Sequence, residues 1–151
     1  MRKIHKVICS AAAAVMLCPL SITAGLDAAG ELSVSDAYAI EKMAMAEAEG
    51  EDATGRMLVM RVVLNRVEDS NFPDTVTGVI SESGAFASYT NGRYESAEPD
   101  IQCVDALEAI TTQRWDESEG ALYFEALDNC DPWHRENLEL LFQHGNHLFY
   151  R

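Results

Sequence analysis

Basic residues are scarce in this chain. Its 151 residues include 11 lysines and arginines against 25 aspartates and glutamates, which gives a formal net charge of −14. A chain this acidic does not bind nucleic acid through the phosphate backbone, and it does not adhere to an anionic membrane or wall polymer by charge attraction. We therefore expect no nucleic-acid partner, and we expect any contact with an anionic polymer to depend on shape, stacking and hydrogen bonds.

The sequence also lacks the short motifs of several large enzyme classes. It contains no Gly-x-Ser-x-Gly elbow, no Walker-type phosphate loop and no dinucleotide fingerprint. Internal repeats and low-complexity tracts are absent as well. The length of 151 residues and the hydrophobic fraction of 48% suit one globular domain. We expect this domain to be a monomer.

The N-terminus has the pattern of an export signal. Arg2, Lys3 and Lys6 precede a mostly apolar segment at 7–20, and an acceptable cleavage site ends at Ala24. The apolar segment has the length of a signal-peptide core and is too short to cross a membrane as a helix. This order of features predicts export from the cytoplasm.

The export signal sets the expected domain boundaries. We predict a signal peptide at 1–24, a short flexible lead-in at 25–34 and one domain at 35–151, secreted and not inserted in a membrane. An uncleaved N-terminal anchor and lipidation at Cys18 remain alternatives, and both also place the domain outside the cytoplasm.

Cysteine is rare beyond the export segment, where only Cys103 and Cys130 remain. In an oxidising compartment two remaining cysteines tend to pair, so the two are a disulfide candidate. The alternative is two independent thiols.

Hydrophobic periodicity and turn residues predict an α+β fold, a helical core followed by a small antiparallel sheet. The expected helices and helical turns lie at 36–48, 53–68, 75–80 and 99–113. The Gly-, Ser- and Asn-rich stretch 83–94 is expected to be a loop or irregular hairpin. Strands are expected at 120–126, 140–142 and 148–150, with a polar loop before the last two and a turn at 144–146.

One carboxylate stands out on the first predicted helix. Ile40, Met43, Ala44 and Glu47 are spaced to share one helical face, so Glu47 ends an otherwise apolar stripe. Burial and a helix C-terminus both disfavour the ionised form of a carboxyl group. A carboxylic acid that stays protonated near neutral pH is what glycoside cleavage requires. The alternative is that Glu47 lies at the edge of the stripe and reaches water.

Aromatic and polar residues elsewhere are suited to a sugar-binding groove. Aromatic rings stack on pyranose faces, and side-chain amides hydrogen-bond to polar groups of a sugar. Core packing is the competing interpretation for each ring. A polar residue within an apolar helical run, such as Asn65, is costly unless it is paired. The candidates are Asn65, Phe86, Tyr123, Trp133, Asn146 and His147.

The histidines also raise the question of a metal. His144 and His147 form a His-x-x-His pair, with His134 and Cys130 nearby in sequence. This spacing matches no strong zinc template and coincides with a turn signal. We expect no metal and no other cofactor.

At the level of whole motifs, the sequence resembles the catalytic domain of the spore cortex-lytic enzyme and cell wall hydrolase family. The resemblance runs from about Tyr38 to Arg151 and keeps the order and spacing of the motifs. They are Glu-Ala-Glu-Gly-Glu at 47–51, Val-Val-Leu-Asn-Arg-Val at 62–67, Phe-Pro-Asp-Thr-Val at 72–76 with Gly-Val-Ile at 78–80, Gly-Ala-Phe at 84–86, Gly-Ala-Leu-Tyr-Phe at 120–124 and Gly-Asn-His-Leu-Phe-Tyr at 145–150.

This resemblance implies a lysozyme-like fold and cleavage of peptidoglycan glycan strands between N-acetylmuramic acid and N-acetylglucosamine. It further implies that Glu47 is the catalytic acid, in a mechanism that uses one carboxylate and yields 1,6-anhydro-muramyl ends. Glu49 occupies a variable position of the motif. Glu51 matches the motif, and we expect it to position Glu47, to cap the next helix or to contact substrate.

Three other interpretations remain open at this stage. The chain can be a hydrolytic muramidase that uses water, an inactive secreted carbohydrate-binding module, or a small interaction domain. The retained Glu47 argues against the inactive module. Vegetative wall and spore cortex both remain candidate substrates.

Overall fold

The computed structural model describes residues 32–151. The predicted signal peptide at 1–24 and most of the lead-in lie outside the described residues. Among residues 32–151, no helix combines the length and the apolar character needed to cross a membrane.

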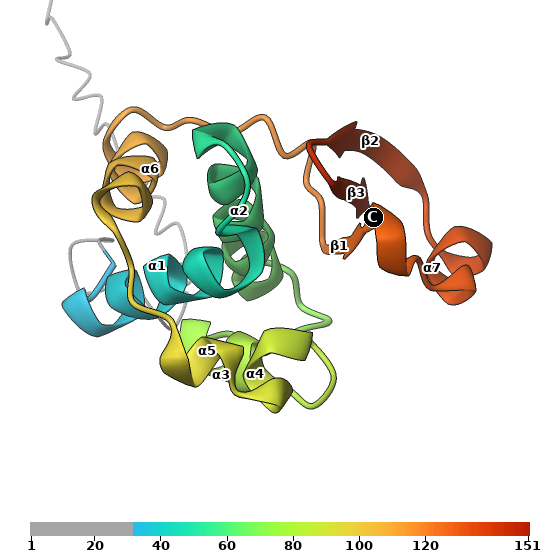
Figure 1. The fold of residues 1–151 in the computed structure, drawn as a ribbon, viewed down its shortest axis with the longest axis horizontal. Helices are drawn as coiled ribbons and strands as arrows, with labels where there is room; N and C mark the ends of the chain where they lie inside the picture. The colour runs from blue at the N-terminus through green and yellow to red at the C-terminus, as the bar shows by residue number, and fades with distance from the viewer. Residues whose placement is uncertain (1–31) are drawn as a thin grey trace, which may run out of the picture.

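The chain builds a helical body first and a sheet second, with the two side by side (Figure 1). The helical body comprises α1 (Val34–Ala48), α2 (Ala53–Glu68), α3 (Val76–Ser81), α4 (Ala87–Asn91), α5 (Arg93–Ser96) and α6 (Ile101–Thr112). Ser33, Asp52 and Asp100 cap the three long helices, each with a side-chain oxygen that accepts a backbone N–H of the first turn.

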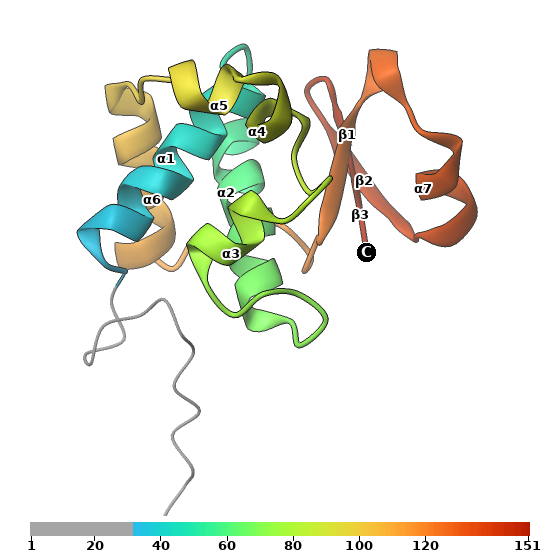
Figure 2. The ribbon, with the colours of Figure 1, turned by 90° about the horizontal axis from the view of Figure 1, so that it is seen from below.

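The second part is a three-stranded antiparallel sheet with a short helix beside it (Figure 2). Its elements are β1 (Tyr123–Ala126), the 3-10 turn Leu127–Asn129, α7 (Pro132–Asn137), β2 (Leu140–His144) and β3 (His147–Tyr150). The strand order is β1-β3-β2, so β3 is central. The two residues Gly145 and Asn146 connect β2 to β3, and Gly145 has a positive φ of 52°, which glycine adopts readily.

Helix α2 holds the two parts together. One face of α2 joins α1 and α6 in the main apolar core, where residues such as Val59, Met60 and Val63 are fully buried. Leu58 and Val62 on α2 form a second cluster with Phe149 of β3. A helix that is apolar on more than one side is expected at the centre of a domain, and α2 occupies that place.

The structure confirms the α+β prediction and the bounds of α2. It departs from the expected pattern in three places. The stretch expected to be a loop contains α4 and the start of α5, and the polar loop before the hairpin contains α7. Strand β1 begins at Tyr123 because Gly120, with φ +72°, and Ala121, which donates to the Ser118 carbonyl, form a turn.

Candidate active site

Glu47 lies in the last turn of α1 and is half-buried. Its Oε1 accepts a hydrogen bond from the backbone N–H of Ser88, the second residue of α4, at 3.2 Å. The same Ser88 is buried, and its hydroxyl lies 3.6 Å from the sulfur of Met43, one turn before Glu47 on the helix. Helix α4 therefore fixes one oxygen of the carboxyl group against the apolar face of α1. The sequence did not reveal Ser88, because the donor is a backbone group of an unexpected helix.

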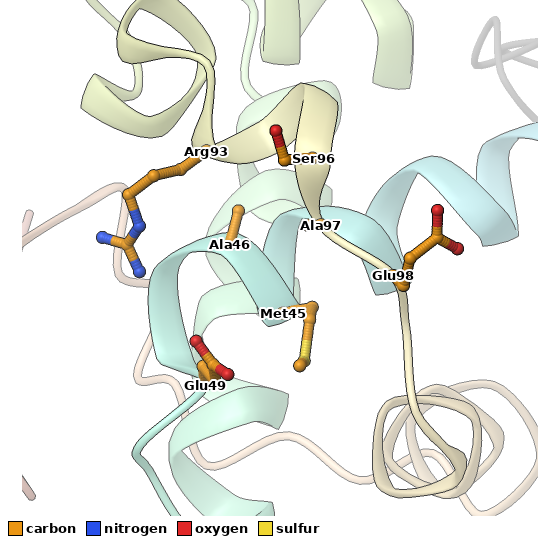
Figure 3. Close-up of a pocket in the computed structure, with 7 residues that line it drawn as sticks. All are labelled: Met45, Ala46, Glu49, Arg93, Ser96, Ala97 and Glu98. Carbon is orange, nitrogen blue, oxygen red and sulfur yellow. The ribbon is translucent and has the colours of Figure 1, made fainter.

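Glu49 points away from Glu47. Two residues advance a helix by about 200°, so the two side chains leave α1 on opposite sides. Glu49 is exposed and lines a surface pocket of about 280 Å³ between the outer side of α1 and the segment 93–98 (Figure 3). This pocket is accordingly not the place where Glu47 acts.

Glu51 reaches the β2–β3 turn rather than Glu47. Its Oε1 accepts the backbone N–H of Asn146 at 3.0 Å and lies 3.3 Å from Nδ1 of His147. Its Oε2 is so close to the turn that a Cβ on Gly145 would lie 1.7 Å from it. The side chain of Glu51 is only 11% exposed. Three of the residues predicted for the site, Glu51, Asn146 and His147, thus form one contact that joins the helical body to the hairpin.

Asp52 makes a second contact with the same hairpin. Its Oδ1 accepts the N–H of Gly55, which caps α2, and lies 2.8 Å from Nε2 of His144. The Gly55 N–H and then His144 hold the pKa of Asp52 below its usual range. His144 and His147, which flank the turn, therefore face separate carboxylates on the α1–α2 corner.

Asn65 is hydrogen-bonded to other parts of the protein. Its Nδ2 donates to the Ser118 hydroxyl at 3.1 Å and to the Ala121 carbonyl at 2.9 Å, and its Oδ1 accepts from Arg61 at 2.9 Å. Both N–H groups of the amide are bonded to protein, and the side chain is buried. A polar residue in an apolar helix must be paired, and Asn65 is. Its amide donates to the segment that enters the sheet. It therefore has no free N–H group to donate to a substrate, as the expected substrate-binding role would need.

Phe86 packs in the core, and next to it lies a buried arginine. The ring of Phe86 is 3% exposed. The guanidinium carbon of Arg66 lies 4.8 Å from the centre of this ring, 5.1 Å from that of Phe72 and 5.2 Å from that of Tyr123. Its Nε donates to the Leu122 carbonyl at 2.7 Å. Cation–π contacts of this kind stabilise a desolvated guanidinium, so Arg66 links the chain leading into α4 to β1. Phe86 is therefore a buried packing residue in this structure and not an open stacking surface.

Tyr123 and Trp133 are the predicted aromatic residues that reach the surface. Their ring centres lie 6.5 Å apart, and Trp133, on α7, is half-exposed. Tyr123 is half-buried and touches Phe72 edge-on at 5.9 Å. These two rings, which the sequence predicted as sugar-binding candidates, lie on the surface beside Arg66.

A buried acid holds the sheet to α7. Glu125 of β1 accepts hydrogen bonds from the Tyr150 hydroxyl and the Asp131 N–H, and it lies 2.8 Å from Nδ1 of His134. Burial favours a higher pKa for Glu125, but the bonds from Tyr150, His134 and Asp131 outweigh it and lower this pKa. Burial and the neighbouring carboxylate raise the pKa of Tyr150 to about 12. The pattern of the sequence did not single out this network.

The expected disulfide is not formed, and that prediction is wrong for this structure. Cys103 and Cys130 are both free thiols. Cys103 is buried in α6, with Nη1 of Arg56 at 3.3 Å from its sulfur, whereas Cys130 follows β1 with its sulfur 3.3 Å from the Leu127 carbonyl. The two residues belong to the helical body and the sheet respectively, which the sequence spacing alone did not reveal.

Comparison with known proteins identifies the family to which this fold belongs. Residues 50–150 match the family described as Cell Wall Hydrolase. The chain belongs to the cell wall hydrolase family. The catalytic domain of the germination-specific lytic transglycosylase SleB from Bacillus anthracis superposes with a TM-score of 0.68 at 31% identity, covering 79% of this chain and 96% of that one. The catalytic domain of the Bacillus cereus SleB protein gives a TM-score of 0.63 at 33% identity, covering 76% and 90%. The fold is therefore lysozyme-like, as expected.

Relatives in sequence are spore cortex-lytic enzymes. That of Oceanobacillus iheyensis is 36% identical over 121 residues, which are 78% of this chain and 42% of the relative. That of Bacillus subtilis is 31% identical over 123 residues, which are 80% of this chain and 39% of the relative. The chain thus spans about two fifths of the length of these relatives.

The family match begins at Gly50 and therefore includes Glu51 but not Glu47. The structure shows the arrangement around Glu47. One oxygen of its carboxyl group accepts a backbone N–H, while Glu49 lines the surface pocket and Glu51 bonds to the β2–β3 turn.

Proposed function

We propose that this protein cleaves the glycan strands of peptidoglycan between N-acetylmuramic acid and N-acetylglucosamine by lytic transglycosylation, with Glu47 as the catalytic acid. Membership of the cell wall hydrolase family supports wall glycan as the substrate. The similarity to a protein named as a lytic transglycosylase supports the type of reaction.

The assignment rests on the directions of the three glutamates at 47, 49 and 51. Only Glu47 presents its carboxyl group on the side of α1 that faces Ser88. Glu49 leaves the helix on the opposite side, and Glu51 is bonded to the β2–β3 turn. A hydrolase of the usual kind needs a second carboxylate, either as nucleophile or to activate water. A transglycosylase needs one, which acts first as acid and then as base.

In the proposed reaction the proton of Glu47 passes to the glycosidic oxygen, and the bond from that oxygen to C1 of the muramyl sugar breaks. The carboxylate of Glu47 then takes the proton of the C6 hydroxyl of the same sugar. The C6 oxygen bonds to C1 and closes the 1,6-anhydro ring, so no water is consumed and Glu47 regains its proton. The Ser88 N–H stays on Oε1 during both transfers, which leaves Oε2 to carry the proton.

We also propose the roles and setting that the residues favour. Tyr123 and Trp133 stack on sugar rings, while Glu51, Asn146 and His147 act through the position of the hairpin. The domain works outside the cytoplasm as a monomer, after export by the segment at 1–24, and spore cortex peptidoglycan is the favoured substrate because the relatives are spore cortex-lytic enzymes.

Product analysis tests the reaction type. Purified vegetative and cortex peptidoglycan are each digested by the protein, and the released fragments are analysed by mass spectrometry. We expect anhydro-muramyl ends. Reducing ends, one water heavier, would show that the reaction is hydrolysis and not transglycosylation. Intact strands from both sources would favour a binding module without activity.

A further inference from the structure

Helix α7 packs against the sheet without a buried residue of its own. All six of its residues, Pro132–Asn137, are exposed or half-buried. The helix stands on the side of the sheet away from the helical body (Figures 1 and 2). Burial of apolar side chains is the main force that fixes a helix against its neighbours, and α7 has little of it. Its position therefore depends on polar contacts and on contacts between rings.

The polar contacts of α7 converge on one carboxylate, that of Glu125 in β1. Its Oε1 accepts the hydroxyl group of Tyr150. Its Oε2 accepts the backbone N–H of Asp131 at 2.7 Å and lies 2.8 Å from Nδ1 of His134. Asp131 is the N-cap of α7 and His134 lies in its middle. A side chain of the sheet that is only 5% exposed thus holds α7 at two points.

The chemistry of this contact defines which groups carry hydrogen. Burial favours a higher pKa for Glu125, but the bonds from Tyr150, His134 and Asp131 outweigh it and lower this pKa. An ionised carboxylate only accepts hydrogen bonds, so Nδ1 of His134 is the donor. Hydrogen bonds to an ionised group are roughly twice as strong as those between neutral groups. The contact is therefore a strong one for so small a helix.

The same contact gathers a row of rings on one face of the sheet. Tyr123 and Glu125 are two residues apart in β1, and Tyr150 is paired with Tyr123 in the ladder, so the three side chains share this face. The His134 ring stacks on Tyr150 at 5.6 Å, with an interplanar angle of 24°. The Trp133 ring lies 5.7 Å from His134 and 6.5 Å from Tyr123. His134 thus connects the buried Glu125 to the half-exposed Trp133.

We propose that His134 is a positioning residue for glycan binding. Its Nδ1 hydrogen bond to Glu125 holds α7 in the place where the Trp133 ring stacks on a sugar. This inference rests on the proposed function, in which Trp133 and Tyr123 contact sugar rings. His134 acts through Trp133 and does not itself contact the substrate.

The energetics favour a role in binding over a role in folding. Desolvating an ionised carboxylate costs free energy, and here the bonds that offset this cost go in large part to a helix that belongs to neither apolar cluster. A fixed α7 therefore adds little to the core. It does fix Trp133, which is 50% exposed. A ring that is already held in place binds a ligand more tightly than a mobile one, because less conformational freedom is lost on binding.

Two substitutions at position 134 separate the hydrogen bond from the ring. His134→Phe keeps a ring that can stack on Tyr150 and removes the Nδ1 donor. His134→Asn removes the ring and keeps an N–H donor close to the place of Nδ1. Glu136→Gln changes an exposed residue of the same helix and is the control. Because the His134 side chain is 21% exposed and outside the core, all three variants are expected to fold, and thermal unfolding verifies this.

Binding is measured by calorimetric titration with soluble glycan fragments. Every substitution is made in Glu47→Gln protein, so that the fragments stay uncut. We expect His134→Phe to weaken binding about fivefold, as Trp133→Ala does. His134→Asn and Glu136→Gln should bind within about twofold of the parent protein. In Trp133→Ala protein, His134→Phe should weaken binding no further, because the two substitutions remove the same contact.

Binding by His134→Phe as tight as that of the parent protein would overturn the proposal. An equal loss in His134→Asn would also overturn it, as would a further loss when His134→Phe is added to Trp133→Ala. Cleavage is tested separately, in protein that retains Glu47. If that protein leaves the fragments intact while binding follows the expected pattern, the positioning role of His134 is supported and the proposed function is overturned instead.

Discussion

The carboxylate of Glu51 occupies the space that a side chain at position 145 would need. A Cβ built on Gly145 would lie 1.7 Å from Oε2 of Glu51, and Oε1 of the same carboxylate accepts the Asn146 N–H at 3.0 Å. The corner between α1 and α2 is therefore fastened to the tip of the β2–β3 hairpin. Because Glu47 lies in the last turn of α1, next to this corner, the contact sets where the hairpin lies relative to the candidate acid.

This contact predicts a large cost for Gly145→Ala. The substitution brings a methyl group against Glu51 and places a side chain at φ +52°, so we expect a loss of roughly 2–4 kcal/mol in the free energy of unfolding. Gly92→Ala is the control, because it has a positive φ of 86° but nothing within 4 Å of the new Cβ. It should cost about 1 kcal/mol. Urea unfolding measures both, and equal losses would show that the contact with Glu51 contributes nothing.

Tyr150 should titrate far above an ordinary tyrosine. Burial and the neighbouring Glu125 raise its pKa to about 12, against about 10 for an exposed tyrosine. Because the pKa of Tyr150 is higher in the folded protein than in the unfolded chain, the contribution of this residue to stability is fully present below pH 10. It is lost between about pH 10 and pH 12, because Tyr150 ionises first in the unfolded chain. The difference between the ultraviolet titration curves of the unchanged protein and of Tyr150→Phe should show one step near pH 12. A step near pH 10 in protein that is still folded by circular dichroism would refute the buried pair.

The role of Asn65 can be separated from substrate binding. Asn65→Ala leaves the Ala121 carbonyl without its donor and removes one of the two partners of the Ser118 hydroxyl, which still donates to Asp116. We therefore expect a loss of about 1–3 kcal/mol in stability. The KM for glycan fragments should stay unchanged at a temperature where the variant is folded. A raised KM with unchanged stability would restore Asn65 to the substrate-binding residues.

Helix periodicity and caps made much of the fold predictable. The bounds of α2 follow from Asp52 as N-cap and from its apolar pattern, and the hairpin follows from Gly145-Asn146 between two apolar runs. Helix α7 was missed although Asp131 and Pro132 form a recognisable start, an N-cap followed by proline at the first helical position. Gly92 lies in the stretch expected to be a loop or irregular hairpin, but its left-handed conformation ends α4 instead.

The sequence singled out candidate residues for the site but not the way in which they are arranged. The helical stripe pointed to Glu47, whereas the partner on its carboxyl group is a backbone N–H, which no residue type signals. Asn65 and Glu51 were noted as unusual polar residues, but sequence spacing does not reveal that their partners are Ala121 and Asn146, far along the chain. Contacts between distant segments are set by tertiary packing, and this is also why Cys103 and Cys130 were wrongly paired.

The most direct test compares Glu47→Gln with Glu49→Gln. Each variant replaces a carboxyl group by an amide of the same size in the same stretch of the chain, but only Glu47 faces Ser88. The initial rate of fragment release from peptidoglycan is measured for both, with thermal unfolding as the check on folding. We predict a loss of about 1,000-fold for Glu47→Gln, within the range for a removed general acid, and a rate within about twofold of the unchanged protein for Glu49→Gln. A Glu47→Gln variant that is folded and cleaves within tenfold of the unchanged rate would contradict the assignment of Glu47 as the acid.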